Sequence, residues 1–150
     1  MKDAKDIKIA IVSSSFREEV SKNLEKNCLK TLKEKGLADS QIEIFRVPGS
    51  WEIPIVVKKL AKKGNFDAVI TFGAIVKGET YHFEQISNEV ARSLMEISLQ
   101  YEIPVIFEVL AVYDLKNALE RATRKEENKG IEAAETALKM IEVTSDLALR

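Results

Sequence analysis

Cysteine is nearly absent from this sequence, since Cys28 is the only one among 150 residues. A single thiol excludes an intrachain disulfide and a zinc site built from several thiolates. Cys28 stands at helical spacing from Leu24 and Leu32, so we expect a buried, reduced thiol and not a nucleophile. Histidine is equally scarce, and His82 alone could bind a metal only with several carboxylates beside it. We therefore expect no bound metal.

The sequence also lacks an excess of charge and a long apolar run. Its 23 basic and 24 acidic residues are mixed along the chain and leave a formal charge of −1. A nucleic-acid binder usually carries a basic stripe, whereas Lys58, Lys59, Lys62 and Lys63 fit the solvated face of a helix. No apolar run approaches the roughly 20 residues of a membrane helix, and the charged segment 1–6 lacks the apolar stretch of a signal peptide. We expect a cytoplasmic protein with no nucleic-acid partner and no membrane partner.

Strand-like and helical segments alternate along the chain. Its length and its 45% hydrophobic content suit a single globular domain over residues 1–150, with a flexible segment at about 1–6. Short, largely apolar segments rich in β-branched residues predict strands at 7–13, 41–47, 67–73 and 103–110. Amphipathic segments predict helices at about 20–36, 50–63, 80–101, 114–122 and 130–149. This alternation predicts an α/β fold, a flavodoxin-like three-layer sandwich with a four-stranded parallel sheet between two layers of helices.

The segments that follow the predicted strands contain the unusual side chains. In an open parallel sheet, ligands bind beyond the carboxyl ends of the strands. Phe16 and Trp51 stand in two such segments, where an aromatic ring can stack on a flat heterocycle or simply pack the loop onto the domain. Glu52 could accept hydrogen bonds from hydroxyl groups, or could merely favour the dipole of the helix that it begins. Both interpretations stay open for each residue.

A second group of residues could bind an anion and move a proton. Gly78, Glu79 and Thr80 come just before a long predicted helix, where free backbone N–H groups suit a phosphate, although a glycine turn with a threonine cap explains the same residues. Arg121 ends a short predicted helix and could complete an anion site, or could be an ordinary surface arginine. His82 falls in the first turn of the long helix, whose positive end disfavours an imidazolium. We expect a neutral ring that can act as a base, with a purely structural histidine as the alternative.

Taken together, the sequence resembles the lumazine synthase (6,7-dimethyl-8-ribityllumazine synthase) family from about residue 7 to the C-terminus. The resemblance is carried by VPGSWEIP at 47–54, GAIVKGETYH at 73–82, PVIF at 104–107, ERA at 120–122 and NKG at 128–130. The first two segments are highly specific at this spacing. The resemblance implies a transferase of riboflavin biosynthesis that needs no cofactor. It would condense 5-amino-6-(D-ribitylamino)uracil with 3,4-dihydroxy-2-butanone 4-phosphate and release phosphate and water. It also implies a homopentamer or a shell of twelve pentamers.

The resemblance further implies a role for each matching residue. Phe16 would stack on the pyrimidine, and the ribityl chain would be held by Ser50, Trp51 and Glu52. The edge of the uracil would meet Ala74, Ile75 and Val76. The phosphate would be bound by the backbone N–H groups of Glu79 and Thr80 and by the side chain of Arg121. His82 would transfer protons. Phe107 and Lys129 would close the pocket from its far side, with Glu132 as a partner for a nearby cation. The pocket would join Phe16, Trp51 and His82 of one subunit to Phe107, Arg121 and Lys129 of the next.

Some positions depart from the pattern of the family, and two other functions compete with this one. Glu108 and Thr123 stand where glycine is expected, and Glu79 stands where a small residue is common. An archaeal-type riboflavin synthase is a related alternative, but such an enzyme would not need the GETYH segment at 78–82. A non-catalytic flavodoxin-like binding module is the alternative from another class. It would have no reason to keep aromatic, anion-binding and basic groups together at the ends of strands.

Overall fold

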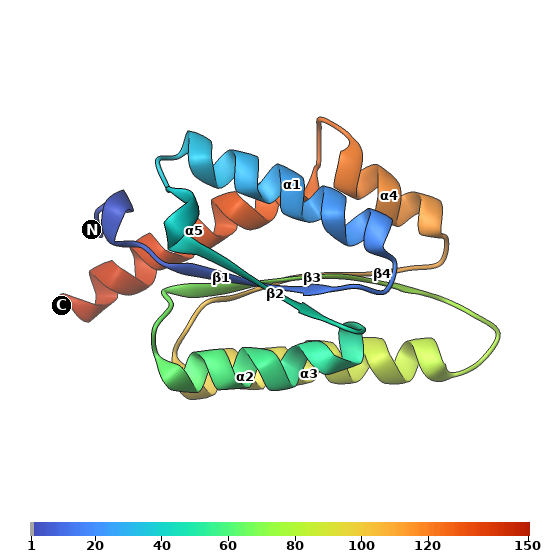
Figure 1. Cartoon of the computed structure of the whole chain (residues 1–150). Coiled ribbons are helices and arrows are strands. Elements are labelled where there is room, and N and C mark those ends of the chain that lie inside the picture. The colour runs from blue at the N-terminus through green and yellow to red at the C-terminus, as the bar shows by residue number, and fades with distance from the viewer. Residues whose placement is uncertain (1) are drawn as a thin grey trace.

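Four parallel strands form the central layer of the molecule, and helices pack on both of its faces (Figure 1). The computed structural model describes residues 2–150. The strands are β1 (Ile9–Ser14), β2 (Ile42–Val47), β3 (Ala68–Val76) and β4 (Val105–Val112), in the order β2-β1-β3-β4 across the sheet. One face is covered by α1 (Glu18–Glu34), α4 (Leu115–Thr123) and α5 (Lys129–Ala148), and the other by α2 (Ile53–Lys63) and α3 (His82–Tyr101). The predicted α/β sandwich is confirmed.

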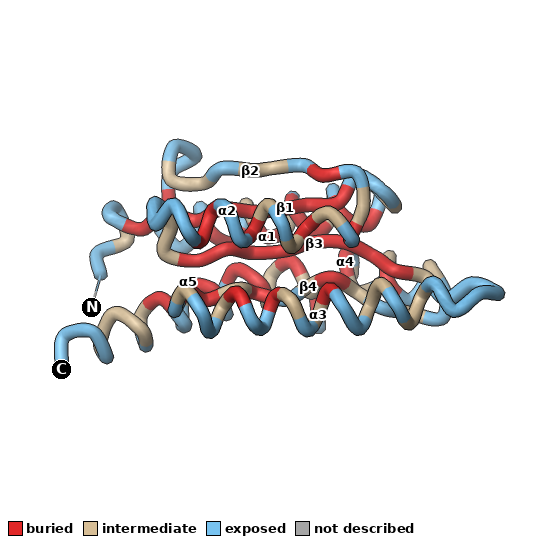
Figure 2. The backbone as a smooth tube through the Cα atoms, turned by 90° about the horizontal axis from the view of Figure 1, so that it is seen from below, coloured by how far each residue is buried: buried red, intermediate tan, exposed pale blue. Residues whose placement is uncertain are grey.

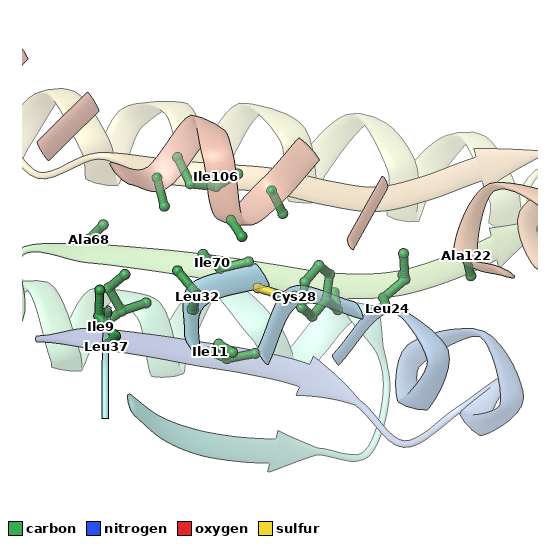
Figure 3. Packing of buried hydrophobic residues seen from close by; sticks show 14 of the residues in the cluster. Ile9, Ile11, Leu24, Cys28, Leu32, Leu37, Ala68, Ile70, Ile106 and Ala122 are labelled. Atoms are coloured by element: carbon green, nitrogen blue, oxygen red, sulfur yellow. The ribbon is translucent and has the colours of Figure 1, made fainter. Parts of the chain in front are cut away.

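The two central strands, β1 and β3, are buried on both faces, which explains why their sequences are almost continuously apolar. Every residue of β1 is buried, and so is all of β3 except its last residue. Alternate residues of these strands face opposite helix layers. Figure 3 shows the layer of α1, where Leu24, Cys28 and Leu32 lie against Ile11 and Ile70 of the sheet. Cys28 is fully buried, as the helical spacing predicts, and this burial raises the pKa of its thiol to about 12.

The ends of several elements differ from those that periodicity predicts. β3 continues three residues beyond its predicted end, because residues 73–76 pair with residues 109–112 of β4. The predicted helix 50–63 divides into a 3-10 turn at Ser50–Glu52 followed by α2, and the long helix predicted from Thr80 begins at His82. In the segment expected to be flexible, Ala4–Asp6 form a 3-10 turn. Met1 of that segment lies outside the described residues.

Capping side chains fix where the last two helices begin. The carboxylate of Asp114 accepts a hydrogen bond from the N–H of Lys116 at 3.0 Å and so caps α4. Asn128 caps α5 through its Oδ1, which accepts from the N–H groups of Gly130 and Ile131. Within residues 2–150, no helix combines the length and apolar composition that a membrane span requires.

The parallel sheet brings the four strand-following segments to one end of the molecule. Figure 2 shows the buried centre along β1 and β3, and an exposed segment between β3 and α3 that extends beyond the sheet. In Figure 1 this segment and α4 lie at the same end of the sheet, while both chain termini lie at the other. The fold therefore separates a potential ligand-binding end from the end that carries the termini.

Candidate active site

A cleft of about 670 Å³ opens at the carboxyl edge of the sheet. Its walls come from the loops that follow β1, β2 and β3 and from the first turns of α3. Nine of the thirteen site residues predicted from the sequence line it: Phe16, Ser50, Trp51, Glu52, Ala74, Ile75, Val76, Thr80 and His82. The sequence segments singled out after three of the strands thus meet around one space.

Two aromatic side chains lie exposed over this cleft. The side chain of Phe16 is 62% exposed and that of Trp51 is 57% exposed. The loops that carry them are joined by backbone hydrogen bonds, from Ser15 N–H to the Val47 carbonyl at 2.7 Å and from Phe16 N–H to the Pro48 carbonyl at 3.1 Å. Rings that line a cleft and contribute little to the core are free to stack on a flat ligand.

The floor of the cleft depends on a glycine in β3. A Cβ atom at Gly73 would lie 2.7 Å from Oγ of Ser50 and 3.4 Å from Cβ of Ser14, so any larger residue would force the Ser50 side chain to move. Ser50 is consequently only 8% exposed although it lines the cleft. Its hydroxyl group therefore lies close to Gly73 of β3, at the lining of the cleft.

The last residues of β3 keep one backbone edge free of strand pairing. β3 pairs with β1 only as far as Phe72, whereas it pairs with β4 as far as Val76. Among residues 2–150, no strand pairs with 74–76 on the β1 side. Because those residues line the cleft, their N–H and C=O groups on this side can recognise the polar edge of a planar ligand.

His82 is the first residue of α3 and lies at the rim of the cleft. Its ring is exposed, and its backbone N–H donates to Oγ1 of Thr80 at 3.4 Å. The positive end of the dipole of this 20-residue helix therefore adjoins the imidazole. Since the helix begins at His82, Glu79 and Thr80 belong to the preceding loop. Of these two, only Thr80 lines the cleft.

The loop between β3 and α3 is tied to the end of β4 at its base. The N–H of Lys77 donates to the Val112 carbonyl at 2.9 Å, and the Lys77 ammonium forms an ion pair with Glu84. This contact raises the pKa of Lys77 and lowers the pKa of Glu84 through their hydrogen bond. The same ammonium lies 5.5 Å from the ring centroid of Phe83, whose ring lies 6.0 Å from that of Tyr113. These contacts position the start of α3, and with it His82.

Four predicted site residues do not line the cleft: Glu79, Phe107, Arg121 and Lys129. Phe107 lies on the edge strand β4 and is 46% exposed. Arg121 is in the last turn of α4 and Lys129 begins α5, on the face of the sheet opposite α3. Lys129 forms an ion pair with Glu132 at 3.0 Å, as predicted for a nearby cation. The chain alone therefore does not bring these basic groups to the cleft.

The cleft also contains residues that the sequence argument did not select. Arg17 lines it with a left-handed backbone (φ 60) and holds its guanidinium 5.1 Å from the ring centroid of Phe16. Gln85 and Ile86 line it from α3. The sequence could have predicted Gln85 and Ile86 as lining residues, because they follow His82 by three and four residues and share its helix face. Arg17 immediately follows a residue already selected.

The chain was compared with models of known protein families. A family model described as 6,7-dimethyl-8-ribityllumazine synthase matches residues 6–145 of the chain. This span contains all four strands and every site residue predicted from the sequence.

Proposed function

Because the chain belongs to the 6,7-dimethyl-8-ribityllumazine synthase family, we propose that it is the transferase that condenses 5-amino-6-(D-ribitylamino)uracil with 3,4-dihydroxy-2-butanone 4-phosphate. The reaction releases phosphate and water and belongs to riboflavin biosynthesis. The cleft at the carboxyl edge of the sheet supports this proposal most directly. Exposed aromatic rings, a serine hydroxyl group and an imidazole line one space of about 670 Å³.

The pyrimidine substrate fits the part of the cleft between the aromatic wall and the end of β3. Phe16 would stack on the heterocycle, whose polar edge would meet the backbone groups of 74–76 that lack a strand partner on the β1 side. Ser50, Trp51 and Glu52 form one turn along the cleft and would hold the ribityl chain. A hydroxyl, an indole N–H and a carboxylate offer both donors and acceptors to a polyol.

The chemical steps need positioning, one proton shuttle and a place for the anion. Schiff-base formation, elimination of phosphate and ring closure proceed between two substrates held in contact. His82 would carry the protons, since it is the only histidine of the chain and lines the cleft. The backbone N–H groups of Glu79 and Thr80, just before α3, would receive the phosphate together with Arg121.

We propose that Arg121, Lys129 and Phe107 reach the cleft from a neighbouring subunit of a ring. All three lie along the side of the molecule formed by β4, α4 and α5, and none lines the cleft of its own chain. β4 is an edge strand, so this side is open to a second copy. A head-to-tail contact that closes into a ring would then wall off each cleft with the next subunit, in a homopentamer or in a shell of pentamers.

The reaction is tested by incubating the protein with both substrates and following the absorbance and fluorescence of the lumazine. The proposal requires that lumazine accumulates and that phosphate is released in equal amount. Conversion of added lumazine to riboflavin would instead identify a riboflavin synthase. Binding of the pyrimidine without turnover would identify a binding module, and either result would refute the proposed reaction.

The shared site is tested with two variants that are each nearly inactive. His82→Ala should slow turnover by up to about 10²–10⁴-fold, as is typical for loss of a general base. Arg121→Ala should lose the phosphate contact. After the two variants are unfolded, mixed equally and refolded, about a quarter of the interfaces should pair an intact His82 with an intact Arg121. Activity should recover toward that fraction of wild type, while each variant refolded alone is the control. Mixed rings that stay as inactive as the controls would place the site within one subunit.

A further inference from the structure

Arg17 connects the loop after β1 to α1, and its backbone adopts a conformation that is uncommon for a residue other than glycine. Its φ of 60 and ψ of 50 lie in the left-handed region. Its carbonyl oxygen accepts hydrogen bonds from the N–H groups of Val20 at 3.0 Å and Ser21 at 3.3 Å, so this residue begins the helix. Its side chain makes no capping hydrogen bond, and a cation is unfavourable at the positive end of a helix dipole. The start of α1 therefore does not explain an arginine at this position.

The guanidinium of Arg17 lies over the ring of Phe16, at 5.1 Å from the ring centroid. Both residues line the cleft. The Nε atom of Arg17 is buried, and within residues 2–150 it has no hydrogen-bond partner. The attraction between a cation and the face of an aromatic ring is thus the interaction that the structure shows for this guanidinium.

The backbone of Phe16 is held at both of its polar groups, whereas its ring is not packed into the core. The N–H of Phe16 donates to the Pro48 carbonyl at 3.1 Å, and its carbonyl accepts from Oγ of Ser14 at 3.3 Å. The side chain is nevertheless 62% exposed, so packing in the core does little to select among the staggered rotamers of its χ1 angle. The guanidinium of Arg17 over one face of the ring favours the observed rotamer and leaves the opposite face for a ligand.

We infer that Arg17 is a positioning residue, which holds the ring of Phe16 in the orientation on which the pyrimidine stacks and does not itself touch the pyrimidine. The inference rests on the proposed function, because the ligand is the pyrimidine substrate. It gives a reason for a strained backbone beside a binding site. Without the guanidinium, the ring can distribute over about three staggered rotamers. If one of them is competent for stacking, the competent fraction falls to roughly a third and the apparent affinity falls about threefold.

The test measures binding of 5-amino-6-(D-ribitylamino)uracil and of inorganic phosphate by calorimetry, together with the kinetics of lumazine formation. Arg17→Met keeps a long unbranched side chain and removes the charge. It should weaken pyrimidine binding about threefold, raise the KM for the pyrimidine by the same factor, lower kcat by less, and leave phosphate binding unchanged. Arg17→Lys keeps a cation that can lie over the ring and should bind the pyrimidine more tightly than Arg17→Met does. Lys26→Met is the matched control, because it removes an exposed cation of α1 that does not line the cleft, and it should follow wild type throughout.

A double-mutant cycle with Phe16 separates positioning from direct contact. Phe16→Leu removes the stacking surface and should itself weaken pyrimidine binding. If Arg17 acts through the ring, Arg17→Met should weaken binding no further in the Phe16→Leu protein. A loss of about threefold in that background as well would show that Arg17 contacts the pyrimidine directly, and would overturn the inference. A loss of phosphate affinity in Arg17→Met would make Arg17 an anion ligand and would overturn it too.

The outcomes also separate this inference from the proposed function. If the protein makes lumazine and Phe16→Leu weakens pyrimidine binding, but Arg17→Met follows wild type, the inference alone fails. If Phe16→Leu binds the pyrimidine as wild type does, the stacking role of Phe16 fails and the inference fails with it. A wild-type protein that binds no pyrimidine refutes the proposed function and the inference together. Arg17→Gln is a second uncharged variant, and the same loss of about threefold is expected from it.

Discussion

Gly130, the second residue of α5, lies where the start of that helix touches α1. A Cβ atom at this position would lie 2.5 Å from the backbone carbonyl oxygen of Leu24, 3.1 Å from Cβ of Asn27 and 3.2 Å from Oδ1 of Asn128. The first of these atoms belongs to the backbone of α1, so it cannot move aside as a flexible side chain would. Gly130→Ala therefore forces the two helices apart.

Three effects determine the stability of Gly130→Ala, one stabilising and two destabilising. Alanine is the better helix former by up to about 1 kcal/mol. Overpacking a fixed site costs about 1–3 kcal/mol. Displacing Asn128, whose Oδ1 caps α5 at 2.9 Å and 3.1 Å, costs a further 0.5–2 kcal/mol, roughly. The steric effects outweigh helix propensity, and we expect a net loss of about 1–3 kcal/mol in the free energy of unfolding.

The loss is measured by urea denaturation followed by circular dichroism, at one fixed protein concentration because the proposed ring would contribute to stability. Gly78→Ala is the matched control, since a Cβ atom there would meet nothing within 4 Å. Its free energy of unfolding should stay within about 0.5 kcal/mol of wild type. A Gly130→Ala protein as stable as wild type, or more stable, would refute the argument that this close approach requires glycine.

Two further predictions concern titrating groups in the core and beside it. Burial raises the pKa of Glu108 from 4.5 to about 7, so between these pH values the folded protein keeps a proton that the unfolded chain has released. The resulting loss in the free energy of unfolding is absent below about pH 4.5 and reaches its full size above about pH 7. Glu108→Gln should therefore stabilise the protein by about 1–2 kcal/mol at pH 8, after allowance for screening by water, and hardly at all at pH 4.5; urea denaturation at both pH values checks this, and an equal effect at both contradicts it. Cys28 has a pKa raised to about 12 by burial, so a thiol reagent at pH 8 should not modify the folded protein and should modify one thiol per chain in urea; rapid modification of the folded protein would show that the thiol is accessible.

The strands and helices were predictable because their signals are local. The continuous apolar segments of β1 and β3 and the helical spacing of Leu24, Cys28 and Leu32 each reflect a short stretch of chain in contact with one buried environment. The ends of elements were less predictable because they depend on distant partners. β3 continues to Val76 because β4 pairs with it there, and no residue of β3 carries that information.

The candidate site was likewise predictable from the sequence only in part. Residues that follow strands could be assigned to one end of the molecule, because parallel strands place their carboxyl ends at a common edge. The resemblance to a family then supplied a proposed role for Phe16, Trp51 and His82. That Arg17 and Gln85 line the same cleft, and that Glu108 is partly buried, required the folded chain.

The sequence by itself determined the class of fold, the end of the sheet at which a ligand site is expected and the family of the protein. These follow from periodicity, from the common direction of parallel strands and from segments that are contiguous in the chain. Only the tertiary structure decided that the cleft is formed without Phe107, Arg121 and Lys129, and that Gly130 must remain a glycine. Both depend on distances between atoms that are far apart in the sequence, and such distances are fixed by the packing of whole elements against one another.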